Sequence, residues 1–165
     1  MGKRADELIE RLGLEEHPEG GYFREIFRSD LEVETKEAEA RRRNALTSIY
    51  FLLRGEQISR WHVVASDEAW HFYEGDPLEL HVFDPLTNST TEHLLGTRVA
   101  AGQVPVAIVP AGCWQAARPR GDYSLVGCSV GPGFDFEDFQ FVSDLEETSQ
   151  RFEEVRDLAR LRQLL

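Results

Sequence analysis

The sequence predicts an all-β sandwich or barrel with a helix at each end of the chain. Short runs of aromatic and β-branched residues recur from Tyr22 to Phe141, and glycine, proline, aspartate or asparagine separates one run from the next. Many short strands at such spacing are typical of a sandwich or barrel, and not of alternating strands and helices. Both ends of the chain instead repeat apolar residues at helical spacing.

Residues 1–14 are expected to form the N-terminal helix, because Leu8, Ile9 and Leu12 share one helical face. Turn-forming residues over 15–21 end this helix, and a strand follows over 22–27. Residues 32–43 carry only scattered apolar side chains. They predict a solvated loop between two strands in preference to a short exposed helix.

The barrel itself is expected to span residues 15–142. Its later strands are bounded by turn residues such as those at 75–77, 110–112 and 131–133. The expected strands are 45–53, 58–65, 68–74, 78–84, 90–95, 105–109, 113–118, 123–130 and 138–142.

The C-terminal residues 143–165 predict an amphipathic helix that packs on the barrel or on a partner subunit. Ser143 and Glu146 have the spacing of a capping box, and Phe152, Val155 and Leu158 begin an apolar stripe. With about 150 residues per domain as a guide, the 165 residues are expected to form a single domain.

Charge and cysteine content restrict the partners and the compartment. The chain has 30 acidic and 18 basic residues, a net charge of −12, which disfavours binding to nucleic acid or to an anionic membrane surface. The N-terminal residues carry charges throughout and lack the apolar stretch of a secretion signal. Cys113 and Cys128 are expected to be buried thiols. Together these features predict a cytoplasmic protein.

Acidic residues concentrate in the segment 132–147, which contains six acids and no base. Phenylalanines alternate with these acids, so the segment is not a solvated tail. We expect it to form the closing strand and the start of the last helix, with its aromatic side chains on the barrel and Asp135, Glu137 and Asp138 facing water or the turn.

Two segments carry the residues best suited to chemistry. The stretch 55–75 contains His62, His71 and Glu68, and its expected partner is the strand–turn–strand 109–115. Together they resemble the two motifs of the cupin superfamily. Gly55, Glu68 and Gly75 match the frame of the first motif, and Pro110-Ala111-Gly112 matches the turn of the second.

Three further stretches are similar to one single-domain branch of the cupins, whose members are largely uncharacterised. They read HPEGGYFRE from His17, SDEAWHFYEG from Ser66 and PGFDFEDF from Pro132. The resemblance covers residues 10–142 and implies a cupin-type jelly-roll barrel (a double-stranded β-helix) that pairs as a homodimer. The jelly-roll fold hosts many activities, so it does not by itself define a function.

The metal ligands of the cupin motifs are only partly present. Strict spacing places Trp61 and Val63 at the His-x-His positions, whereas a shift of one residue places Arg60 and His62 there. We favour the shift because it turns polar side chains inward. Gln115 occupies the position of the third histidine. No metal is therefore favoured; if Fe, Mn, Ni or Zn binds, the expected ligands are His62, Glu68 and His71.

His62 and Glu68 are the expected catalytic residues, because a carboxylate beside an imidazole can raise its basicity for proton abstraction next to a carbonyl. The favoured function is a metal-independent isomerase or epimerase that binds a small sugar-like or carbonyl-containing molecule. Two alternatives stay open: a metal-dependent oxygenase or isomerase, and a non-enzymatic binding or scaffold protein.

Further side chains are expected to contact the ligand inside the barrel. Arg24 suits a carboxylate or phosphate because its guanidinium is planar and forked. A structural salt bridge to Glu25 or to an acid of the segment 132–147 is the alternative, and it is slightly favoured. Aromatic side chains must line part of a small barrel. The expected ligand-binding residues are Tyr22, Arg24, Ser59, Trp70, Phe72 and Gln115.

Overall fold

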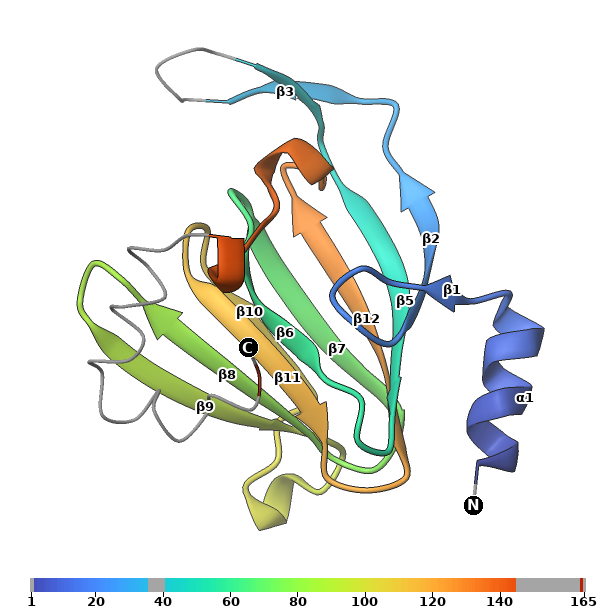
Figure 1. The fold of residues 1–165 in the computed structure, drawn as a ribbon. Helices are drawn as coiled ribbons and strands as arrows, with labels where there is room; N and C mark the ends of the chain where they lie inside the picture. Colours follow the sequence, from blue (N-terminus) through green and yellow to red (C-terminus); the bar gives the residue numbers. More distant parts are fainter. Residues whose placement is uncertain (1, 36–40, 145–163, 165) are drawn as a thin grey trace.

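The computed structural model describes residues 2–35, 41–144 and 164 (Figure 1). One α-helix, α1 Lys3–Leu12, precedes the strands. The strands are β1 Glu15–Glu16, β2 Tyr22–Arg28, β3 Glu32–Glu34, β4 Arg42–Asn44, β5 Thr47–Arg54, β6 Ser59–Val63, β7 Asp67–Gly75, β8 Leu78–Asp84, β9 Ser89–Leu95, β10 Val106–Val109, β11 Trp114–Pro119, β12 Tyr123–Gly131 and β13 Gln140–Phe141.

Two antiparallel sheets pack against each other to form the barrel. The six-stranded sheet has the order β1-β2-β5-β12-β7-β10, and the five-stranded sheet has the order β13-β6-β11-β8-β9. Side chains alternate across each strand. Phe51 and Trp70 from the first sheet therefore meet Leu80 and Val82 from the second in one buried core.

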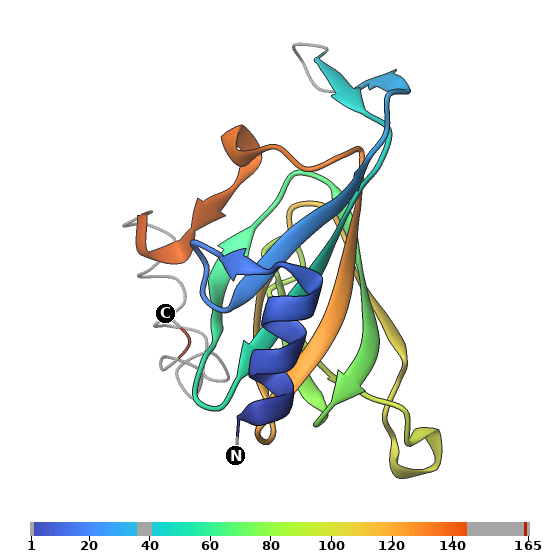
Figure 2. The ribbon, with the colours of Figure 1, turned by 90° about the vertical axis from the view of Figure 1, so that its right-hand side faces the viewer.

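A second apolar cluster covers the outer face of the six-stranded sheet. Leu52 and Leu125 point away from the central core and pack against Ala5 and Leu8 of α1. Figure 2 shows the helix lying along this face. Arg4 adds an ion pair with Glu74 of β7, at 2.7 Å between Nε and Oε1.

The outer face of the five-stranded sheet is also apolar at one end. Trp61, Phe83 and Trp114 form a cluster there with Val142 and Leu164, and Leu164 is fully buried although it is the penultimate residue. The described end of the chain thus lies against the barrel (Figure 1).

The short strands β3 and β4 pair with each other and form an arm that projects from the barrel. The expectation of a loop over 32–43 was wrong at these residues; residues 36–40 lie outside the described part. Arg43 of the arm is buried, forms an ion pair with Asp138 and donates to the carbonyl oxygen of Gly133. Arg41 also contacts Asp138, at 2.6 Å.

Most expected elements are confirmed. The N-terminal helix and the strands from β5 to β12 match the expected ranges within two residues at each end. The last expected strand is shorter, because the 3₁₀ turn Phe136–Asp138 precedes β13. The expected C-terminal helix falls largely on residues 145–163, outside the described residues. Among the described residues, no helix has the length and apolar character needed to cross a membrane.

Candidate functional site

A small cavity lies between the two sheets, near the end from which the arm projects. Its free volume is about 70 Å³, enough for roughly a few water molecules. Two histidines and two glutamates reach its inner part from three parts of the chain. They are His17 and Glu19 before β2, His62 on β6, and Glu68 on β7.

The Gly20-Gly21 turn places His17 and Glu19 in the cavity. Both glycines have positive φ, 111° and 74°, a region that other residues adopt only with strain. A Cβ on Gly20 would collide with the backbone oxygen of Ile58, and one on Gly21 would lie 2.6 Å from the backbone oxygen of Leu52. Only glycine therefore lets this loop lie close against β5 and β6.

A bulge in β6 brings Ser59 and His62 to the same side. The pairing with β11 shifts register between Gln115 and Ala117, so that β6 has one residue more than β11 over this stretch. Strict alternation would place Ser59 and His62 on opposite faces. With the bulge, both side chains are buried and face Glu19, while Trp61 faces outward into the second cluster.

The hydrogen bonds of His62 define where its proton sits. Nδ1 lies 2.7 Å from the carbonyl oxygen of Arg60, which can only accept, so Nδ1 carries the proton. Nε2 of the neutral ring is then an acceptor, and it lies 3.3 Å from Oε2 of Glu19. The two atoms are within ion-pair distance, so a proton on either group would let His62 and Glu19 hydrogen-bond.

Glu19 is held by two further contacts. Its Oε1 accepts a hydrogen bond of 2.8 Å from Ser59 Oγ. Its backbone N–H donates to Nδ1 of His17 at 3.2 Å, which leaves the proton of neutral His17 on Nε2. Ser59 therefore positions Glu19 and does not line the cavity.

Glu68 is oriented by a chain of buried side chains. Trp70 Nε1 donates to Gln115 Oε1 at 2.9 Å, and Gln115 Nε2 donates to Glu68. The Cys128 thiol also hydrogen-bonds Glu68. Gln115 is fully buried and both ends of its amide are occupied, so it positions Glu68 and presents no free group to a ligand.

Burial controls the protonation states in this cavity. It raises the pKa values of Glu19 and Glu68, and nearby His17 and His62 offset this only in part. It also lowers the pKa values of both histidines, against the opposing effect of the two glutamates. The site therefore combines neutral imidazoles with carboxyl groups that gain protons readily.

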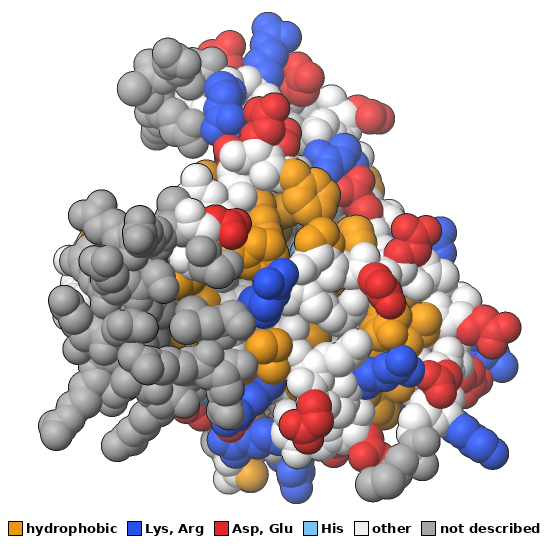
Figure 3. Space-filling model, in the orientation of Figure 1, with side chains coloured by type: hydrophobic (Ala, Val, Ile, Leu, Met, Phe, Trp, Pro, Cys, Tyr) orange, Lys and Arg blue, Asp and Glu red, His pale blue; other side chains and the backbone are white. Residues whose placement is uncertain are grey.

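Aromatic side chains close the cavity on its outer side. Phe139 stacks on His62 with ring centroids 5.1 Å apart, and Phe136 stacks on His17 at 6.4 Å. In Figure 3, apolar side chains gather below the arm, over the segment that follows β12. Asp138 was expected to face water or the turn, but its side chain is only 7 % exposed, because Arg41 and Arg43 surround it and anchor this segment.

The structure separates several expected site residues from the cavity. Tyr22 and Arg24 lie on the outer side of β2: Tyr22 accepts from Arg54, and Arg24 donates to the carbonyl oxygen of Leu12 at the end of α1. The neighbouring Phe23 and Glu25 line the cavity instead. Phe72 packs against the central core.

The histidine set expected for a metal does not come together. Glu68 faces the cavity, and alternation along β7 places His71 on the opposite face of the strand. Arg60 donates to the carbonyl oxygen of Pro18 and lies over Phe141. Among the described residues, no group of three or more histidine, cysteine or acidic side chains is arranged to hold a metal ion.

The sequence reasoning missed His17 and Glu19. Their signal was the pair His-x-Glu directly before two glycines, which indicates a tight loop able to carry polar groups against a sheet. Arg28 was also missed. It lines the cavity mouth and is bound by both carboxylate oxygens of Glu25, at 2.7 and 3.0 Å.

Comparison with known proteins identifies the family to which this chain belongs. The family model described as "Cupin superfamily (DUF985)" matches residues 6–142. The chain therefore belongs to this family, and its two-sheet barrel is the cupin jelly roll.

Particular relatives share the fold over nearly the whole chain. A hypothetical protein from Leishmania major is 35 % identical, with a TM-score of 0.84 over 94 % of this chain and 97 % of that one. Protein SO0799 from Shewanella oneidensis is 37 % identical, with a TM-score of 0.76 over 93 % and 96 %. The uncharacterized protein YML079W from Saccharomyces cerevisiae is 28 % identical over 86 % of this chain and 76 % of its own.

More distant cupins share the fold alone. An oxalate decarboxylase from Bacillus subtilis is 16 % identical, with a TM-score of 0.53 over 74 % of this chain and 28 % of that one.

Proposed function

We propose that the cavity is the active site of a metal-independent isomerase or epimerase that acts on a small carbonyl-containing, sugar-like molecule. One observation carries this proposal. The carbonyl oxygen of Arg60 fixes the tautomer of His62, which leaves Nε2 as an acceptor 3.3 Å from Glu19 Oε2, and the carboxyl group of Glu68 is close enough to act on the same imidazole. An acid and a base thus adjoin one enclosed space.

The structure adds Glu19 to the expected pair of His62 and Glu68. Glu19 Oε2 lies 3.3 Å from the imidazole, and Glu68 acts on it electrostatically. Glu68 is left with one oxygen bound to Gln115 and a raised pKa, which makes its carboxylate a stronger base near neutral pH. Glu68 is therefore assigned as the base, and the His62–Glu19 pair as the acid.

The proposed reaction moves protons and consumes no other reactant. Glu68 takes a proton from the carbon next to the carbonyl, while the His62–Glu19 pair gives a proton to the carbonyl oxygen, which forms an enediol. For the isomer, Glu68 returns its proton to the former carbonyl carbon, and the hydroxyl group on the neighbouring carbon gives its proton back to the His62–Glu19 pair. For the epimer, the enediol first turns its other face to Glu68, the proton returns to the original carbon on that face, and the oxygen gives its proton back to the pair.

The size and lining of the cavity restrict the substrate. A free volume of about 70 Å³ admits the reacting carbons of a small molecule and excludes a whole nucleotide sugar. Phe23, Phe134 and Phe139 line the cavity together with Val64, and such apolar walls keep water from the enediol.

Deuterium exchange tests the proposal directly. Pyruvate, dihydroxyacetone phosphate and glyceraldehyde would each be incubated with the protein in heavy water, and proton NMR would follow the signal next to the carbonyl. We expect deuterium incorporation into at least one compound, unaffected by a chelator. Glu68→Gln and Glu19→Gln should each slow it by about a hundredfold or more.

Arg24→Gln supplies the control, because Arg24 was an expected site residue that lies on the outer side of β2. It should exchange at the wild-type rate. Exchange that persists in Glu68→Gln, or that is absent for all three compounds with the wild-type protein, would contradict the proposal.

A further inference from the structure

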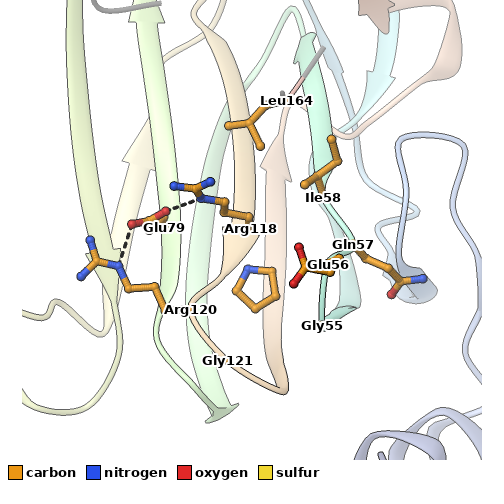
Figure 4. A pocket seen from close by; sticks show the side chains of 10 residues that line it. Gly55, Glu56, Gln57, Ile58, Glu79, Arg118, Arg120, Gly121 and Leu164 are labelled. Carbon is orange, nitrogen blue, oxygen red and sulfur yellow. Dashed lines mark hydrogen bonds and ion pairs between the residues drawn. The ribbon is translucent and has the colours of Figure 1, made fainter. Parts of the chain in front are cut away.

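A second hollow lies on the outer face of the five-stranded sheet, at the end of the strands away from the arm. Its volume is about 440 Å³, within the range of small-molecule sites. Figure 4 shows Arg118, Glu79 and Arg120 on one side of it, and Ile58 with Glu56 across from them. Gly55, Gln57, Pro119, Gly121 and Leu164 complete the lining.

Two arginines in this hollow share one carboxylate. Arg118 and Arg120 each donate Nε to Glu79, to different oxygens, and Glu79 is only 7 % exposed. Burial alone would raise the pKa of Glu79, but these hydrogen bonds outweigh burial and lower it, so the group is ionised.

The terminal nitrogens of both guanidinium groups make few hydrogen bonds within the described part of the chain. Within the described part of the chain, the terminal nitrogens of Arg118 have no hydrogen-bond partner, and those of Arg120 have one long contact, 3.5 Å to Glu92. The two side chains are 36 % and 47 % exposed. Glu79 therefore works as a brace that holds two forked donors side by side at the hollow.

A buried histidine next to this brace is also unsatisfied. His81 is 5 % exposed, and its Nε2 has no hydrogen-bond partner among the residues that the structure describes. That atom lies 3.9 Å from Glu79 Oε2, on the same face of the sheet as the arginines. Buried polar atoms without partners are uncommon in folded proteins and frequently mark a place where a bound group or water completes the network.

We propose that this hollow is a binding site for a small organic anion, a carboxylate or phosphate, whose body carries hydroxyl groups. The free ends of Arg118 and Arg120 match the oxygens of such an anion in geometry and charge. Glu56 on the opposite side accepts hydrogen bonds from hydroxyl groups, and Ile58 packs against the carbon skeleton. This site is separate from the cavity that contains His62 and Glu68.

Titration calorimetry with glucose 6-phosphate tests the site. Binding is expected with a dissociation constant of about 1 mM or tighter, and glucose and inorganic phosphate, which each lack half of the recognised features, should bind more weakly. Arg118→Gln should weaken binding about tenfold, because it removes charge-assisted hydrogen bonds. Glu79→Gln should also weaken binding, because a neutral amide with one acceptor oxygen no longer holds both guanidinium groups in place.

Two control variants locate the bound molecule. Arg42→Gln removes a guanidinium on the arm that is 74 % exposed and should leave the affinity unchanged. Arg24→Gln, on the outer side of β2, should do the same. Circular dichroism of each variant confirms that it is folded. The inference fails if glucose 6-phosphate does not bind, if Arg118→Gln binds it as the wild type does, or if either control variant abolishes binding.

Discussion

Glu68 is buried inside the barrel, where its negative charge is poorly solvated and therefore unfavourable. Burial raises its pKa, and only the amide of Gln115, the thiol of Cys128 and nearby His62 oppose that shift. A carboxyl group whose pKa is higher in the folded state than in the unfolded state stabilises the fold below the unfolded pKa, and this contribution is lost as pH rises through the folded value. The ionised carboxyl group of Glu68 therefore lowers the stability of the fold at alkaline pH.

The variant Glu68→Gln should reverse this effect. Its neutral amide can still accept from Gln115 and cannot ionise, so above about pH 7 the variant should have a higher free energy of unfolding than the wild type. Urea denaturation across a pH series measures the difference. Glu137→Gln is the control, because that carboxylate is 81 % exposed; it should follow the wild type. Parallel curves for Glu68→Gln and the wild type would contradict this account.

Local sequence patterns predict the cavity residues that lie on regular strands, but not those that reach the cavity from a loop. Glu68 was predicted because it matches the motif frame, and His62 because a shift of that frame by one residue turns polar side chains inward. Glu19 was not, because its contact with His62 joins residues more than forty positions apart through a loop conformation that alternation does not describe. Tyr22 and Arg24 were expected to face the cavity, but they lie on the other face of β2. Alternation along a strand defines two faces, and it does not say which of them is buried.

At the scale of elements, the loop 17–21 decides whether the site forms. Gly20→Ala should destabilise the protein by more than about 3 kcal/mol, because a positive φ and a collision with the Ile58 backbone oxygen combine. Gly55→Ala is the matched control. Its φ is also positive, 55°, but a Cβ there meets nothing within 4 Å, so only about 1–2 kcal/mol should be lost.

Chemical denaturation of the two glycine variants measures this difference. Deuterium exchange of the substrates then reports the site: Gly55→Ala should retain activity, and any folded Gly20→Ala should lose most of it. Equal destabilisation by the two substitutions would show that the backbone conformation, and not the close contact with β6, explains both glycines.

The strands were predictable because each alternates between a core face and an outer face. The arm was not, because β3 and β4 bury little apolar surface and depend on distant contacts. Arg43 is buried only through Asp138 and Gly133, residues about ninety positions later in the chain. A polar segment that gains order from such ion pairs resembles a loop in its local sequence.

At the scale of the whole molecule, three apolar clusters hold the chain together, and the two outer clusters use residues from its ends. Ala5 and Leu8 of α1 cover one sheet, and Leu164 joins Trp61 and Trp114 on the other. Terminal residues usually tolerate substitution because they are rarely packed. Leu164 departs from that pattern, since none of its surface is exposed.

Leu164→Ala should therefore lower the free energy of unfolding by about 2–5 kcal/mol, the range for a buried leucine that leaves a cavity. Leu86→Ala provides the control, because Leu86 is 94 % exposed in the turn between β8 and β9 and its loss should change stability by less than about 0.5 kcal/mol. Urea denaturation followed by tryptophan fluorescence suits the test, since Trp61 and Trp114 adjoin Leu164. If both variants unfold at the wild-type midpoint, the end of the chain does not contribute to the stability of the barrel.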